Sequence, residues 1–329
     1  MKTLPQLMRV YSREDALQKA ETGHADKRLI ETALRFYATE DGDIGVTYSG
    51  FCIISLPHKP LKSPRDRWER RLLQHGCAMT IEPGFLELGG RTVELGVPYG
   101  STARLIMIYL QTEALRHNSR EVMLGRSMYD WLNRMGMSIG GNSYRQVKEQ
   151  AMRLSACSLR FTWDGISGGR RAAAFKKDSI IEAGMIFVDN DRSAAQGSLW
   201  EDTIMLSQTF FEKLKEHPVP INVGAVRGIS NRSLAIDIYV WLAYRLHTLG
   251  APTRVLWPQL MEQFGPGYRH LRQFRAKFLE SLSFALVVYP EAEVEWDEQG
   301  LVLKPSAPAI PQRRVHQVLL PAELAAVAS

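Results

Sequence analysis

Apolar residues recur every three or four positions in residues 24–39, a spacing that predicts an amphipathic helix. The turn residues of the segment DGDIG end this helix, and residues 44–56 and 78–95 are typical of strands. The N-terminal part of the chain therefore predicts one helix followed by strands.

A sharper series of elements begins at Ser101, which can cap a helix running to about residue 117. A short strand is predicted at 121–124, and a second helix begins at Ser127 and stops at Gly136. Asn142 or Ser143 can cap a third helix that ends near Ala156. Strands at 159–163 and 171–175 then flank a DGISGG turn. Helix, strand, helix, turn, helix and hairpin in this order are typical of a winged helix, a form of helix-turn-helix.

The same order returns about 130 residues later in the chain. The predicted elements are a helix at 233–249, a strand at 253–257, a helix at 258–264, a helix at 268–282, and strands at 285–289, 294–296 and 301–304. Individual residues repeat as well: Ile108-Tyr109 matches Ile238-Tyr239, Gly136 matches Gly265, and residues 144–148 match 268–272. Such a repeat predicts a duplicated unit.

The fold class predicted from these patterns is α+β, with two tandem winged-helix domains related by internal duplication. An N-terminal arm or helix spans 1–43, and the first winged-helix domain with its N-terminal strands spans 44–200. The second domain spans 201–304, including a strand at 203–206 and a capped helix at 207–217. The Pro- and Ala-rich residues 305–329 predict a flexible tail.

The third helix of each unit is the candidate recognition helix, because one face packs on its domain and the other can enter the major groove. In the first unit Val147, Ala151 and Leu154 form the inward stripe. The outward and flanking residues are Ser143, Arg145, Gln146, Lys148, Glu149, Met152 and Arg153. Arg can bond guanine bidentately and Gln can do the same for adenine, so this face has the chemistry to read bases.

In the second unit Leu271, Phe274 and Phe278 are predicted to point inward. The residues predicted to point outward are Arg269, Arg272, Gln273 and Arg275. A charged exposed face can also serve solubility alone. Its occurrence in both copies, on the helix that the motif uses, favours DNA contact.

The two predicted wings differ in charge. Residues 143–177 carry a net charge of +6, and Arg170, Arg171, Lys176 and Lys177 around the hairpin are predicted to follow a phosphate backbone. Residues 284–304 carry a net charge of −4, so this wing is expected to face solvent or a protein partner. The stretch 59–71, with a net charge of +4, is either a solvated loop or a phosphate contact.

Composition agrees with a polyanionic partner inside the cell. The formal net charge is +6 and the pI is about 9.2, and phosphate binding by basic proteins is driven by counterion release. Three scattered cysteines, Cys52, Cys77 and Cys157, indicate reduced thiols. No secretory signal and no apolar run long enough for a membrane span are found, so a cytoplasmic location is expected.

Motifs of catalysis are missing from the sequence. There is no GxxxxGK[ST], no HxH pair and no CxxC, so we expect no enzyme activity, no cofactor and no metal. The acidic groups Glu40, Asp41 and Asp43, and Asp189 with Asp191, are more typical of turns.

Three segments carry a family likeness: residues 96–141, including PYGSTARL and TEALRHNSRE, residues 149–154 and residues 234–246. They resemble the plasmid-encoded RepA replication initiators of Gram-negative bacteria, over roughly residues 45–304. The resemblance implies a protein that binds double-stranded DNA at repeats of its own plasmid origin, promotes local melting, and recruits host replication proteins such as a helicase and an initiator. It also implies repression of its own promoter and allows for a homodimer. A winged-helix transcriptional regulator or autorepressor is the alternative, and a nicking or priming enzyme is a distant third.

Overall fold

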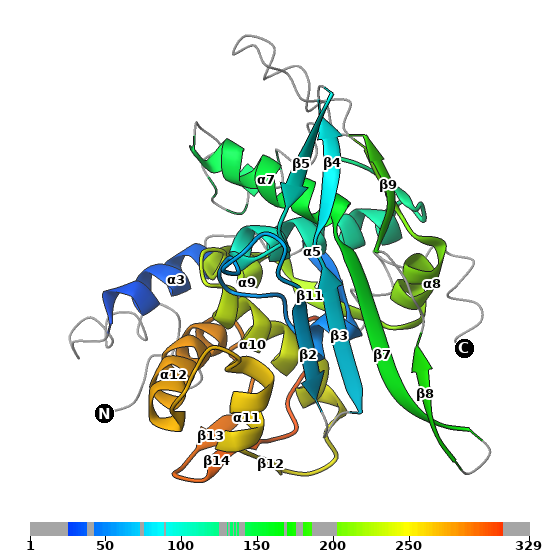
Figure 1. Cartoon of the computed structure of the whole chain (residues 1–329). Coiled ribbons are helices and arrows are strands. Elements are labelled where there is room, and N and C mark those ends of the chain that lie inside the picture. The colour runs from blue at the N-terminus through cyan, green and yellow to red at the C-terminus, as the bar shows by residue number, and fades with distance from the viewer. Residues whose placement is uncertain are drawn as a thin grey trace, which may run out of the picture. The chain divides into compact units, whose positions relative to one another are not determined.

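The computed structural model describes residues 26–37, 43–72, 76–88, 90–124, 130, 132–133, 135, 137, 142–167, 170–175, 180–185 and 203–311. They form a mixture of helices and strands (Figure 1). Contacts divide the chain into two compact units: the inserted unit, residues 48–218, and the split unit, residues 1–47 with 219–329. The helix at residues 27–37, which lies within the predicted arm 1–43, thus shares a unit with residues 219–329.

The inserted unit contains three sheets and four helices among its described elements. In chain order these are α4 (Ser49–Ile53), β2 (Trp68–Leu72), β3 (Cys77–Glu82), β4 (Gly84–Leu88), β5 (Arg91–Leu95), α5 (Gly100–Arg116), β6 (Glu121–Met123), α7 (Asn142–Ala156), β7 (Ser158–Ser167), β8 (Arg170–Phe175), β9 (Ile181–Met185), β10 (Thr203–Leu206) and α8 (Gln208–Glu216). The sheet orders are β2-β3-β7-β8, β6-β10-β9 and β4-β5.

Helix α5 is the centre of the inserted unit, buried on almost every side because it packs against both α7 and α8. It begins at Gly100 with Tyr99 at the cap position and no side-chain cap, so the predicted cap at Ser101 was wrong. The predicted strand 44–56 was also too long. Only β1 (Ile44–Tyr48) is a strand, because α4 follows it and brings Phe51 into an edge-on aromatic cluster with Phe161 and Phe210.

The hairpin predicted over residues 159–175 is present as the antiparallel pair β7–β8, which is longer than the pattern indicated. This hairpin continues a sheet with β2 and β3, while β6 pairs with β10. Of the predicted helix that begins at Ser127, the structure describes only Asp130, Leu132 and Asn133 as helical, and Leu132 is fully buried.

The split unit is mainly helical. Its elements are α3 (Lys27–Tyr37), β1, β11 (Pro218–Asn222), α9 (Val223–Gly228), α10 (Ser233–Arg245), the 3-10 helix η3 (Leu246–Thr248), β12 (Thr253–Leu256), α11 (Trp257–Phe264), α12 (Leu271–Val287), β13 (Val294–Trp296) and β14 (Gly300–Leu303). Strands β1 and β11 pair, and a three-stranded sheet has the order β12-β14-β13. In this unit the strand before α11 therefore pairs with the hairpin that follows α12.

Helix α12 differs from its predicted bounds at both ends. It begins at Leu271 and not at Tyr268, with His270 at the cap position. It also continues to Val287, so the strand predicted at 285–289 was wrong. Residues 284–289 are all buried, so no alternation of exposed and buried positions distinguished a strand from a helix end.

The core beneath α12 is aromatic. The Phe278 ring lies 5.4 Å from the rings of Phe264 and Phe274 and 6.0 Å from that of Trp257. All four side chains are buried. This cluster fixes α12 against α11, as helix packing through large side chains requires.

Candidate nucleic-acid interface

Helix α7 has the two faces that the sequence predicted. Val147, Ala151 and Leu154 are each 3% exposed and pack inward. Arg145 and Gln146 are exposed near the start of the helix, and Lys148 is half-buried. The inward stripe is confirmed, and the exposed Arg145 and Gln146 are placed where DNA could reach them.

Two polar side chains fasten α7 to the segment that precedes α5. Gln150, fully buried, accepts a hydrogen bond from the Tyr99 backbone N–H at 2.9 Å. Arg153 binds Glu149, donates to the Val97 carbonyl at 3.2 Å, and lies 5.2 Å from the Tyr99 ring. With its side chain only 17% exposed, Arg153 holds the helix in place, and its predicted flanking contact with DNA stays a prediction.

Five other predicted contacts cannot be assigned a side-chain position. Ser143 lies in α7, and Arg170 and Arg171 lie in β8, but their side chains are outside the described set. Lys176 and Lys177 lie outside the described residues altogether. These five stay predictions.

In α12 the predicted inward residues Phe274 and Phe278 are fully buried, but Leu271 is 38% exposed, contrary to the prediction. The reason is that Tyr268, on the turn before the helix, packs edge-on against Phe274 at 5.7 Å. Arg272 and Gln273 are exposed on the first turn, and the exposed Arg269 precedes the helix. Among the described residues, none binds these three side chains.

Arg275 was predicted to point toward DNA, but it is half-buried and bound to the protein. Its Nη2 donates to the Asp297 carbonyl at 3.1 Å, and its guanidinium lies 5.0 Å from the Trp257 ring. The Trp257 indole N–H donates to the same carbonyl at 3.0 Å. Arg275 thus connects α12 to the turn between β13 and β14.

Asp297 organises this turn. Its carboxylate accepts two hydrogen bonds from the Arg254 guanidinium, at 2.6 and 2.8 Å. It also accepts hydrogen bonds from the backbone N–H groups of Gln299 and Gly300, at 2.8 and 3.1 Å. The Arg254 hydrogen bond is the main reason why the pKa of Asp297 is below its ordinary value. Glu295 is similarly paired with Lys304 at 2.6 Å. Two of the five acids in residues 284–304 are therefore paired with basic side chains of the same unit.

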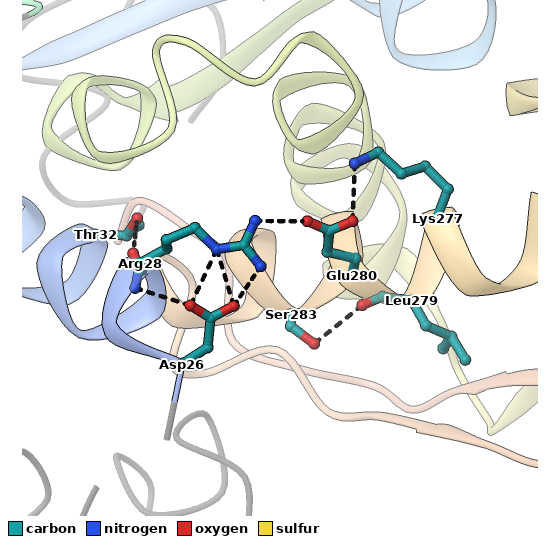
Figure 2. Close-up of polar contacts among 7 residues, drawn as sticks. All are labelled: Asp26, Arg28, Thr32, Lys277, Leu279, Glu280 and Ser283. Atoms are coloured by element: carbon teal, nitrogen blue, oxygen red, sulfur yellow. Dashed lines mark hydrogen bonds and ion pairs between the residues drawn. The ribbon is translucent and has the colours of Figure 1, made fainter. Parts of the chain in front are cut away.

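Helix α3 meets α12 through a chain of ion pairs (Figure 2). The Arg28 guanidinium binds Asp26 at 2.6 Å and Glu280 at 3.2 Å, and Lys277 binds Glu280 at 2.8 Å. Arg232 stacks on the Phe284 ring at 3.7 Å. These contacts fix the C-terminal part of α12 and leave Arg272 on the opposite end of the helix.

The Glu280 pairs predict a pH dependence. The hydrogen bond from Lys277, followed by the charges of Lys277, Arg28 and Arg232, lowers the pKa of Glu280. A lowered pKa in the folded state gives stability that is present above the unfolded value and lost as pH falls through the folded one. Glu280→Gln should therefore be less stable than the wild type near pH 6, and the difference should shrink below about pH 4.5 in denaturation experiments. A difference independent of pH would contradict the assignment.

We also searched the described residues for a metal site, reactive cysteines and a membrane-spanning helix. Among the described residues, no three His, Cys, Asp or Glu side chains lie together as a metal site would need. Glu40, Asp41, Asp189 and Asp191 lie outside that set. The three cysteines are buried and lie outside any disulfide, and burial raises the pKa of Cys157 to about 12, which keeps it a thiol. No helix in the described ranges has the length and apolar character to span a bilayer.

Comparison with known proteins adds the family. Residues 97–256 match the model of the family described as plasmid encoded RepA protein. Over these residues, just under half of its length, the chain is similar to the RepA family. The RepA match runs from the segment fastened to α7 through β12, so it includes α7 but not α12. This match supports a role in the initiation of plasmid replication.

The fold has a counterpart among solved structures. Domains 2 and 3 of RctB match with a TM-score of 0.50 at 8% identity, covering 80% of this chain and 98% of that one. A second structure of RctB domains 2–3 matches with a TM-score of 0.43 at 10% identity, covering 77% and 93%. The first likeness shows a similar fold and nothing further. Curated protein sequences gave no significant match.

Proposed function

We propose that the chain starts plasmid replication by binding repeated double-stranded DNA sites at its own origin, through two winged-helix units whose recognition helices are α7 and α12. The observation that carries the proposal is the first turn of α12. There, the side chains of Arg272 and Gln273 are exposed, and no group within the described residues binds either side chain. Arg and Gln are the side chains that bond guanine and adenine bidentately.

The arrangement of elements supports this assignment in the split unit. Helix α10, strand β12, helices α11 and α12, and the β13–β14 hairpin follow the winged-helix order, and β12 joins the hairpin in one sheet. In the inserted unit α5, β6, α7 and the β7–β8 hairpin keep the order, although β6 pairs with β10. The proposed duplication therefore extends to the helices and the hairpin more than to the sheet.

The proposed mechanism uses binding and not catalysis, and it needs no cofactor. Two recognition helices would contact major-groove faces about one helical turn apart, roughly ten base pairs. Several copies on repeated sites would bend the DNA and assist melting of an adjacent A·T-rich stretch, because its steps deform at lower cost. Recruitment of a host helicase and initiator, homodimer formation and repression of its own promoter belong to the same proposal, and the site of action is the cytoplasm.

The test is a footprint of the full chain on the DNA flanking its own gene, at near-physiological salt. Protection of several regularly spaced direct repeats is the expected result. Protection of one inverted repeat over a promoter would favour the transcriptional regulator. No protection at any concentration would overturn DNA recognition as the function.

A substitution on α12 tests the recognition surface. Arg272→Ala should cost about 1–3 kcal/mol on the protected site and relax preference at one base position, because a bidentate base contact would be lost. Lys277→Ala, on the same helix, removes the same charge and should have little effect on that preference. The measurement is the affinity of the wild type and of both variants for the protected site and for sites with single-base changes. Equal effects of both substitutions would place the recognition surface elsewhere.

A further inference from the structure

The loop 58–67 of the inserted unit carries positive charge that the protein does not neutralise. Arg65 is paired with Glu94 and Arg67 with Glu69. Lys59 and Lys62 are exposed, and within the described part of the chain no carboxylate or other group binds them. The basic groups of the loop without a partner are therefore these two lysines, and they outnumber the one acid of the loop, Asp66, whose carboxylate accepts a backbone N–H.

The loop is held rigidly at its base by a buried arginine of α5. Arg104, only 5% exposed, donates from Nη2 to the Leu56 carbonyl at 2.6 Å and from Nη1 to the Pro57 carbonyl at 3.1 Å. The Trp68 indole donates to the Ser55 carbonyl at 3.2 Å from the other end. A loop fixed in this way loses little conformational entropy when it binds a partner.

A tight turn completes the loop. The Ser63 backbone N–H donates to the Asp66 carboxylate at 2.9 Å, and the Asp66 N–H donates back to the Ser63 carbonyl at 3.1 Å. Together with Pro60 and Pro64, whose φ angles are fixed by their rings, this turn gives the lysines a defined position. A loop that is merely solvated does not require such a framework.

The loop lies beside the recognition helix of the same unit. Gly96 shows the contact, because a Cβ built there would lie 3.3 Å from the Pro64 Cα and 2.6 Å from the Arg153 Nη1. Arg153 belongs to α7, and Gln146, seven residues earlier, lies on the same side of the helix two turns away. The loop thus flanks the side of α7 that carries an exposed base-reading candidate.

We propose that Lys59 and Lys62 bind backbone phosphates of the DNA whose groove receives α7. The inference rests on the proposed function and adds the element that positions α7 on the duplex. Phosphate contacts next to a recognition helix fix its register, while the helix itself reads the bases. Two ammonium groups on a rigid loop beside α7 have the position and the charge for this role.

The test is the salt dependence of DNA binding by the full chain carrying Lys59→Ala and Lys62→Ala. Each phosphate contact contributes about 0.9 to the slope of log K against log salt, so the slope should fall by about 2. A fourfold rise in salt should then cost the variant about tenfold less affinity than it costs the wild type. Specific and random duplexes should be affected alike.

The matched control is Lys213→Ala with Lys215→Ala, which removes the same charge from α8 of the same unit. An unchanged slope in the control and a reduced slope in the loop variant support the proposal. An unchanged slope in both, or equal reductions in both, overturns it while the wild type still binds DNA. A wild type that binds no DNA overturns the proposed function together with this inference.

Discussion

Replacing Phe278 with alanine should lower the free energy of unfolding of the split unit by about 3–5 kcal/mol, the range for truncating a buried aromatic side chain. Phe278 is fully buried at the meeting point of Trp257, Phe264 and Phe274. Its removal leaves a cavity that the neighbouring rings cannot fill, because they are fixed by their own contacts. Native-state hydrogen exchange at amides of α10 and α12 measures the unit separately from the rest of the chain.

The control for Phe278→Ala lies on the same helix. Leu271 is 38% exposed, so Leu271→Ala should change the free energy of unfolding by less than about 1 kcal/mol. If the two substitutions had similar effects, the aromatic cluster would not be the core of this unit. If Phe278→Ala weakened only the exchange protection of α12, the two helices would unfold independently.

Replacing Arg104 with methionine should destabilise the inserted unit by about 2–4 kcal/mol. Hydrogen bonds from a charged donor contribute roughly 1.5–3 kcal/mol, and their loss leaves the Leu56 carbonyl buried without its donor. Methionine keeps most of the side-chain volume, so the cost reflects the polar contacts and not a cavity. The loop 58–67 should open first, which predicts faster amide exchange in residues 55–68 than in α8.

Arg116 of the same helix provides the comparison. Its ion pair with Glu113 is partly exposed, with the arginine side chain 35% and the glutamate side chain 14% exposed, and the pair includes no residue of the segment 55–68. Arg116→Met should therefore leave exchange in residues 55–68 unchanged. Equal protection of the loop in both variants would show that Arg104 does not hold it.

Local periodicity predicted most of the helices and the inward faces of the candidate recognition helices. The stripe of Val147, Ala151 and Leu154 needs only the helical repeat, and α7 ends at Ala156 as expected. The Ser207 cap of α8 is also local, with its hydroxyl accepting from the Phe210 N–H. These features depend on residues within one or two turns of each other, which is the range that a sequence pattern covers.

Contacts between distant residues lie beyond that range. Arg153 binds a carbonyl 56 positions away, and Arg275 binds one 22 positions away. The helical spacing of the sequence could not show that either guanidinium is hydrogen-bonded within the protein. The sequence identifies Asp297 only as one of the acids in residues 284–304, yet its carboxylate and carbonyl order the whole turn. The role of Arg104 could not be predicted from the sequence, because a lone arginine in an apolar helix does not indicate which carbonyls it will bind.

Five of the predicted DNA-contacting residues are exposed, as the sequence predicted: Arg145, Gln146, Arg269, Arg272 and Gln273. Their contact with DNA stays a prediction. The family match includes α7 and ends before α12. The assignment of α12 therefore depends on the order of elements and on its unbound polar first turn. Arg272→Ala tests this part of the assignment directly.

The insertion of residues 48–218 between the two parts of the split unit sets an order of events during synthesis on the ribosome. Arg28 and its partner Glu280 are separated by 252 positions. At about 5–20 residues per second, α3 would wait on the order of 10–50 s after emerging before α12 could cover it. The inserted unit, by contrast, is continuous and can fold as soon as Pro218 has left the ribosome. A nascent chain would thus acquire the α7 surface first, while the N-terminal helix stays exposed to chaperones until translation is nearly complete.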